Sequence, residues 1–243
     1  MSDTIIFPAR FNGGPGFAQG GYLAGTMAEL VGGPARTTFR APTPIEVPLT
    51  IVRDGDKVQL TTVDGTVTVF AESAEVNVSV PDVPDLESVI AARPDYRALQ
   101  DQGTQLRPED TCFVCSPKRF RPDGVELHAA PLGDGSLVAS TWMPEDQYAD
   151  DGVIKDVFIW AVLDCPSGFG AMERIKSEYD LIFTGQLAAN ILAPVHVGEP
   201  HLALGWHIGS EGRKHSAASA ICDLAGNLKA VSESLWIVTE KKS

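Results

Sequence analysis

The sequence predicts an α+β chain built from two consecutive units, each a helix with an antiparallel sheet wrapped around it. Both halves share one order of elements: an apolar helix, then several strands separated by Gly-containing turns. Two stretches also repeat, since 39–48 overlays 191–200 at an offset of 152, and 63–73 overlays 224–234 at an offset of 161. The repeat could arise by chance, but the shared order of elements favours duplication. Each sheet also needs one face covered, and the helix of its own unit can cover it.

The first half, residues 1–80, begins with a predicted helix at 20–31. Leu23, Met27 and Leu30 recur at helical spacing, and Gly32-Gly33-Pro34 ends the helix. Alternating, β-branched stretches then predict strands, and Asp-Gly pairs supply the turns between them. The expected strands are Thr37–Arg40, Leu49–Arg53, Lys57–Thr62 and Thr66–Glu72.

Residues 81–108, rich in Pro, Asp and Glu, are predicted to be a linker with one short helix at Leu86–Ala92. The second half, 109–243, is expected to open with a hairpin of Val125–His128 and Ser136–Trp142. A long helix over 155–177 follows, with a kink or a break at Pro166. The remaining strands are expected at Leu181–Leu192, His201–His207, His215–Asp223 and Leu228–Val238.

Charge and composition exclude several classes of function. The chain of 243 residues has a net charge of −13, which repels phosphate backbones and anionic lipid, so neither nucleic acid nor a membrane is an expected partner. No apolar run approaches the roughly 20 residues of a membrane helix, and the N-terminus lacks the features of a signal peptide. Four cysteines are too few for a disulfide scaffold, so we expect a reduced, cytoplasmic protein.

Three stretches together resemble the tandem, double-hotdog acyl-CoA thioesterases. They are Gly16–Leu23 with its glycine pair, Thr111–Pro117 with two cysteines, and Trp160–Asp164 within the second long helix. The resemblance implies an α+β chain of two fused hotdog units, hydrolysis of acyl-CoA or a related thioester, and no cofactor. It also implies a catalytic Asp at Asp164, and fused pairs of this kind often assemble into homo-oligomers.

Asp164 is the sharpest catalytic candidate. It interrupts an apolar helix, where an unpaired carboxylate costs several kcal/mol and its pKa rises toward that of a useful base. It could activate water or attack the thioester directly; the structural alternative is a carboxylate paired with Arg174 or Lys176. Gly20 and Gly21 open the first helix, whose free N–H groups could stabilise an oxyanion, although glycines can also merely start a helix in a crowded place.

Several further residues are candidates for positioning water or substrate. Gln19 stands where many relatives have His, and it can donate a hydrogen bond but cannot act as a base. Asn12 could bind the carbonyl or form a turn before Gly13-Gly14. By resemblance, Thr184 and Gln186 lie on a strand facing the acid, where they could hold water or simply alternate on a half-exposed strand.

Tyr22 and Trp160 belong to the quoted motifs and are expected to contact substrate. Arg213, in the basic cluster 212–215, could meet the phosphates of coenzyme A or lie in a solvated hairpin turn.

Because the glycine loop comes from the first half and the acid from the second, we expect one composite site. The second site is expected to be degenerate, since Lys155-Asp156-Val157 replaces the glycine loop and Glu29 is shifted by one position.

The cysteines predict no metal site. Cys112 and Cys115 form one Cys-x-x-Cys, short of the four ligands of a zinc site, and Cys165 and Cys222 stand alone in the sequence. A tight turn with two small thiols is the interpretation we prefer over a metal or redox pair.

Two alternatives to thioester hydrolysis remain open. One is dehydration or hydration of an acyl thioester, which usually needs a His at the glycine loop. The other is non-catalytic binding of acyl or other apolar molecules, which the missing His and the degenerate second site favour.

Overall fold

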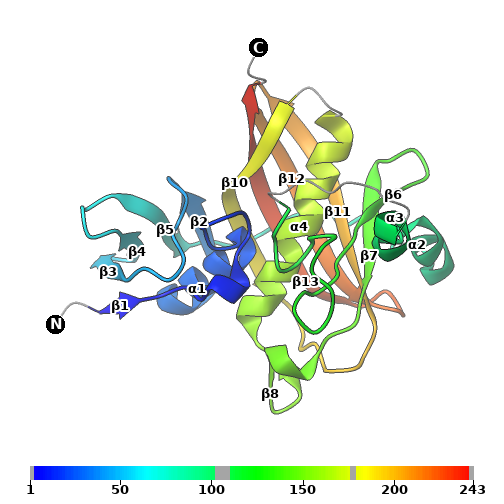
Figure 1. Cartoon of the computed structure of the whole chain (residues 1–243), viewed down its shortest axis with the longest axis horizontal. Coiled ribbons are helices and arrows are strands. Elements are labelled where there is room, and N and C mark those ends of the chain that lie inside the picture. The colour runs from blue at the N-terminus through cyan, green and yellow to red at the C-terminus, as the bar shows by residue number, and fades with distance from the viewer. Residues whose placement is uncertain (1–2, 102–109, 176–178, 241–243) are drawn as a thin grey trace.

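A computed structural model describes residues 3–101, 110–175 and 179–240, and two long helices dominate it (Figure 1). These are α1 (Gly20–Val31) and α4 (Asp156–Ile175), and their positions agree with the sequence prediction. The described helices also include α2 (Leu86–Ala92), α3 (Tyr96–Asp101) and short 3-10 turns at Ala9–Phe11 and Asp146–Tyr148. None of the described helices is both long and apolar enough to cross a bilayer.

The described strands form one eleven-stranded antiparallel sheet and one small hairpin. In the large sheet the order is β1-β3-β4-β5-β2-β10-β13-β12-β11-β7-β6. Its strands are β1 (Thr4–Ile5), β2 (Ala35–Phe39), β3 (Leu49–Asp54), β4 (Lys57–Thr61), β5 (Val67–Ser73), β6 (Ala130–Leu132), β7 (Leu137–Trp142), β10 (Tyr179–Ile191), β11 (His201–Glu211), β12 (Lys214–Asp223) and β13 (Leu228–Glu240). The hairpin pairs β8 (Ala149–Asp150) with β9 (Val153–Ile154).

Both halves of the sheet have the same strand order. The first half runs β2-β5-β4-β3 and the second β10-β13-β12-β11. The halves join where β2 pairs with β10, with Thr38 opposite Gln186. In Figure 1 the blue and cyan strands of the first half continue into the long yellow-to-red strands of the second, across which α4 lies.

Backbone hydrogen bonds repeat at the offsets found in the sequence. After β2, the N–H groups of Arg40 and Ala41 both donate to the Thr68 carbonyl. After β10, the N–H groups of Leu192 and Ala193 both donate to the Lys229 carbonyl. The donors correspond at the offset of 152 and the acceptors at the offset of 161. The β11–β12 hairpin, with strands of 11 and 10 residues, is longer than the β3–β4 hairpin, with 6 and 5. The longer hairpin, followed by a loop (224–227) that is one residue shorter than its counterpart (62–66), accounts for the change of offset.

The approach to each helix repeats as well. The N–H of Ala18 donates to the carbonyl of Thr43, and the N–H of Ile154 donates to the carbonyl of Val195. The residues before the helices thus correspond at an offset of 136, which matches Gly20 with Asp156.

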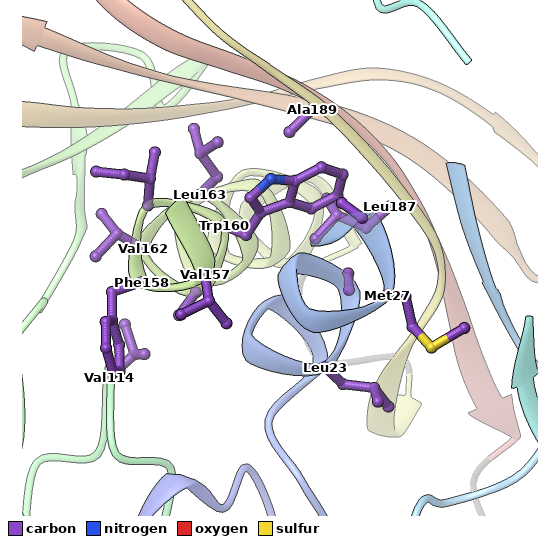
Figure 2. Close-up of a cluster of buried hydrophobic side chains, with 14 of the residues drawn as sticks. Leu23, Met27, Val114, Val157, Phe158, Trp160, Val162, Leu163, Leu187 and Ala189 are labelled. Carbon is purple, nitrogen blue, oxygen red and sulfur yellow. The ribbon is translucent and has the colours of Figure 1, made fainter. Parts of the chain in front are cut away.

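The main core lies where both helices pack on one face of the sheet. Leu23, Met27, Trp160, Leu163 and Leu187 are among its buried side chains (Figure 2). The opposite face of the sheet carries a second apolar cluster, in which Val89 of α2 packs with Leu202 and Leu204 of β11. The segment expected to be a linker therefore covers part of the sheet.

Three sequence expectations need correction. Residues 125–128 are not a strand, because the N–H groups of Val125 and Leu127 donate to the carbonyls of Phe113 and Val114 rather than to a neighbouring strand. The described hairpin instead begins at β6. Helix α3 was not predicted, and α4 continues through Pro166 without a break.

Candidate active site

Asp164 receives hydrogen bonds from three groups, two at the start of α1 and one on β10. Its Oδ2 accepts from the Gln19 side-chain amide at 2.8 Å and from the Gly21 backbone N–H at 3.1 Å. Its Oδ1 accepts from the Thr184 hydroxyl at 3.1 Å. The carboxyl group is buried between α1, α4 and β10, with only 4% of Asp164 exposed. All four of these residues are candidates from the sequence, and the structure brings them together.

Gln19 is the N-cap of α1, and this position fixes its orientation. Its Oε1 accepts the N–H of Tyr22 at 2.6 Å, which satisfies one of the free donors of the first helical turn. The Nε2 must then face α4, where it donates to Asp164. Gln19 therefore orients the carboxylate and caps the helix with the two ends of one amide.

The glycine pair allows α1 to approach α4 closely. A Cβ on Gly21 would lie 2.7 Å from both Ala161 Cα and Asp164 Cβ, and closer still to the Trp160 carbonyl oxygen. A Cβ on Gly20 would lie 2.9 Å from Asp164 Oδ2 and from Thr184 Oγ1. Both positions therefore require glycine because of the helix crossing and the site itself.

The two glycine N–H groups differ in whether they already donate a hydrogen bond. The Gly21 N–H, expected as an oxyanion donor, donates to Asp164 instead. Within the described part of the chain no hydrogen bond of the Gly20 N–H is found, and Gly20 is half-buried. Gly20 is therefore the free donor of the helix N-terminus.

Burial raises the pKa of the Asp164 carboxyl from its ordinary value to about 7, and negative charge on the Cys112 sulfur adds to this rise. The hydrogen bonds from Thr184 and Gly21 act in the opposite direction, because they stabilise the ionised form.

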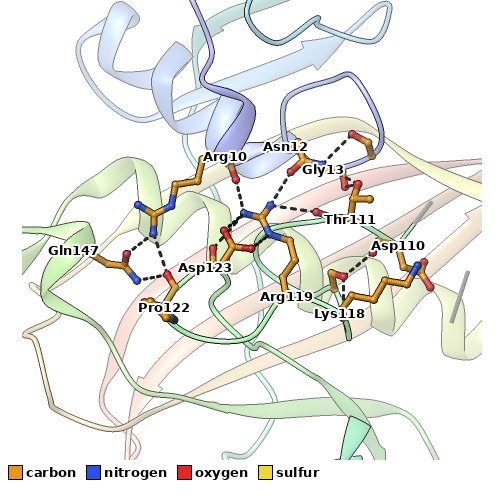
Figure 3. A network of polar contacts seen from close by, with 12 residues as sticks. Arg10, Asn12, Gly13, Asp110, Thr111, Lys118, Arg119, Pro122, Asp123 and Gln147 are labelled. Atoms are coloured by element: carbon orange, nitrogen blue, oxygen red, sulfur yellow. Dashed lines mark hydrogen bonds and ion pairs between the residues drawn. The ribbon is translucent and has the colours of Figure 1, made fainter. Parts of the chain in front are cut away.

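Asn12 belongs to a polar network beside the site rather than to the group around Asp164 (Figure 3). Its Nδ2 donates to Thr111 Oγ1 at 2.8 Å, and its Oδ1 accepts from Arg119 at 2.7 Å. Arg119 also donates to both carboxylate oxygens of Asp123. These contacts tie the loop before α1 to the segment 111–123. The Asn12 Nδ2 also donates to the Gly14 carbonyl at 3.3 Å, within the loop itself.

The other predicted substrate-binding residues lie at varied positions. Gln186 donates to Thr38 Oγ1 across the β2–β10 pair at 3.1 Å. Arg213 is exposed in the turn between β11 and β12. Tyr22 packs against Phe11, with ring centroids 4.6 Å apart, and Trp160 is buried where α4 crosses α1.

Cys165 does not stand alone, contrary to the sequence interpretation. Its sulfur lies 3.8 Å from that of Cys112, which comes from the turn 112–115. No local pattern in the sequence indicates this contact, because it joins a turn to a helix residue 53 positions away. All four cysteines are free.

A cavity of about 290 Å³ opens at the start of α4 rather than at Asp164. It is lined by Val153, Ile154, Asp156, Ile159 and residues 191–195. Asp156 corresponds to Gly20 at the offset of 136, so this cavity lies beside the counterpart of the glycine loop.

Solved structures with the hotdog fold match nearly the whole chain. A tesB protein of Mycobacterium avium subs paratuberculosis matches with a TM-score of 0.61 and 11% identity, over 97% of this chain and 92% of its own. A protein of unknown function with a hot dog fold from Alicyclobacillus acidocaldarius gives 0.60 and 15%, over 98% and 93%. An acyl-CoA thioesterase II of Mycobacterium marinum gives 0.59 and 13%, over 94% and 93%.

These matches show that the chain has the hotdog fold of TesB-type thioesterases. No protein-family model matches the sequence, and no curated protein matches it.

Proposed function

We propose that the chain is an acyl-thioester hydrolase made of two fused hotdog units, 1–80 and 109–243, joined by the segment 81–108. Equal strand order in the halves and backbone contacts repeated at fixed offsets support two units that form an internal pseudo-dimer. The fold of TesB-type thioesterases supports the reaction class. The substrate class is acyl-CoA or another acyl-carrier thioester, and the four free cysteines suit a reduced, cytoplasmic setting.

The observation that carries the proposal is the convergence of Gln19, Gly21 and Thr184 on the Asp164 carboxylate. Two donors hold Oδ2 and one holds Oδ1, so Oδ1 keeps a lone pair for a proton. In the proposed reaction Asp164 removes a proton from water held beside Thr184, and the water oxygen attacks the thioester carbon. The Gly20 N–H at the helix N-terminus stabilises the oxyanion, and the thiol leaves with the proton.

The site is composite and single in this proposal. At the offset of 136, Ala28 of the first half corresponds to Asp164 of the second, and Lys155 corresponds to Gln19. The second location therefore lacks both the acid and the glycine loop. Glu29 comes one residue later and is exposed, so it does not replace the acid.

Thiol release from short, long and aromatic acyl-CoAs tests the function. Asp164→Asn keeps the shape of the side chain and an acceptor for Gln19 and Gly21, so it should fold and lose activity by about 10²–10⁴-fold. Asp156→Asn is the matched control, because this exposed carboxylate opens the same helix at the second location. Full activity in Asp164→Asn would contradict the proposed site, and equal loss in Asp156→Asn would contradict a single site.

A second candidate, the non-catalytic acyl binder, is favoured by the deep burial of Asp164. If the chain is such a binder, acyl-CoA should raise its Tm without any release of thiol.

Transfer of ¹⁸O from labelled water separates base catalysis from attack by Asp164. In a single turnover the base mechanism labels the acid product. Direct attack expels the thiol and forms a mixed anhydride with Asp164, and water that opens this anhydride at the Asp164 carboxyl carbon leaves the label on the enzyme.

A further inference from the structure

Three thiols meet beside the proposed site. Cys112 and Cys115 lie in the turn 112–115, and Cys165 comes from α4. All three sulfur atoms lie within 4.8 Å of one another. The turn is held closed by a hydrogen bond from the Ser116 N–H to the Cys112 carbonyl at 3.0 Å. Because its two thiols face a helix that carries the third, the group draws on two separate elements of the fold.

The spacing of the sulfurs suits a tetrahedral ion. With zinc–sulfur bonds of about 2.3 Å, two thiolates at a tetrahedral centre lie about 3.8 Å apart. The Cys112 and Cys165 sulfurs are 3.8 Å apart, so this pair already has the required separation. A disulfide would need the same two atoms at about 2 Å.

A side-chain donor also reaches this group of thiols. The Gln19 Nε2 lies 3.7 Å from the Cys165 sulfur, on the side of α4 that faces the proposed site.

We propose that Cys112, Cys115 and Cys165 bind one Zn²⁺ as three thiolates, with water as the fourth ligand. Binding releases three thiol protons and forms three sulfur–zinc bonds, with no change of oxidation state. Thiolates are soft ligands that select zinc over the oxygen-seeking Mg²⁺ and Ca²⁺. The ion ties the turn 112–115 to α4 next to Asp164. This inference does not depend on the proposed hydrolase activity.

The first test is the zinc content of the full chain purified under reducing conditions with zinc supplied. One zinc per chain is expected for the wild type. Cys112→Ser and Cys165→Ser should lower the content to background. Cys222→Ser is the matched control and should keep one zinc, because Cys222 is equally a buried free cysteine but belongs to the apolar cluster on the other face of the sheet. Loss of zinc in Cys222→Ser alone, or no zinc in the wild type, would overturn the proposal.

The second test uses wild-type protein only and so does not depend on how variants fold. Metal-free protein, with four reduced thiols counted after denaturation, is titrated with Co²⁺. A thiolate-to-cobalt charge-transfer band that saturates at one ion per chain is the expected result, and Zn²⁺ should displace it. Absence of this band while the four thiols are reduced contradicts the site. A band that persists unchanged in Cys165→Ser would contradict the three-thiolate arrangement.

Discussion

Gly21→Ala should weaken both folding and activity, because the new methyl group has no room between α1 and α4. It would lie 2.7 Å from Ala161 Cα and from Asp164 Cβ, whereas carbon atoms in contact are about 3.5–4.0 Å apart. Since Ala161 Cα belongs to the backbone, the helices must separate by roughly 1 Å. Overpacking of this kind costs about 1–3 kcal/mol, offset by about 0.5–1 kcal/mol from the better helix propensity of Ala.

The net loss of about 1–2 kcal/mol should lower Tm by about 2–8 °C in a chain of this length. Activity should fall more steeply, by about 10²-fold, because the shift moves Gly20 and the Gly21 N–H away from Asp164. Thermal unfolding and thiol release measure the two effects. Gly33→Ala is the matched control, since its Cβ would meet nothing within 4 Å. A Gly21→Ala protein as stable and active as Gly33→Ala would refute the close approach of the helices as the basis of the site.

Three further predictions follow from other contacts. Thr184→Val removes the donor to Asp164 Oδ1 and should lower kcat for thiol release by about 10–100-fold, with a loss of about 1–3 kcal/mol in stability because the buried carboxylate loses a donor. An unchanged kcat would exclude Thr184 from the site. Arg119→Met should lower the free energy of unfolding in urea by about 2 kcal/mol, because Arg119 links Asn12 to Asp123. Arg97→Met is the control: Arg97 belongs to an exposed ion pair, so its loss should lower the same free energy by less than about 1 kcal/mol. Burial lowers the pKa of His201, so the stability that its neutral form provides above about pH 6.5 is lost as the pH falls through the folded-state pKa. Between pH 7 and 5, the free energy of unfolding of His201→Phe should therefore fall less than that of the wild type. Equal losses would contradict this assignment.

Local sequence signals predicted the parts of the fold that local physics controls. Both long helices and α2 follow from apolar spacing and end signals, and β2–β5, β7 and β10–β13 follow from alternation and turn residues, whereas β1, β6, β8 and β9 were not predicted. Asp164 was recognisable because a carboxylate inside an apolar helix needs partners. Gln19 was recognisable because it precedes two glycines at a helix start.

The contacts that the sequence did not predict are all long-range. Residues 125–128 alternate like a strand, yet their N–H groups find carbonyls in the turn 112–115. Arg119 resembles any loop cation until the fold brings Asn12 to it. Cys165 appears isolated because its thiol partners lie on a turn whose position depends on that same irregular pairing. In each case the partner is chosen by tertiary packing rather than by spacing along the chain.

The proposed pseudo-dimer also gives a reason for a single composite site. In that proposal the start of each long helix lies against the middle of the other, so a duplicated chain would begin with two equivalent locations. At one of them the chain has Gly20 and Gly21 facing Asp164. At the other, Asp156 and Val157 replace the glycines and Ala28 replaces the acid.

An alanine rather than an acid at position 28 is favourable for folding. Each buried carboxylate costs several kcal/mol unless donors compensate it, and at the start of α1 Gln19 and Gly21 supply two of them. Restoring a carboxylate with Ala28→Asp would therefore bury a charge beside a helix start that has no counterpart of the Gln19 amide, because the exposed Lys155 takes that position. We expect that variant to lose stability without gaining thioesterase activity, which urea unfolding and thiol release would measure. A gain of activity would mean that the second location needs only its acid, and that the glycine loop is not what distinguishes the two.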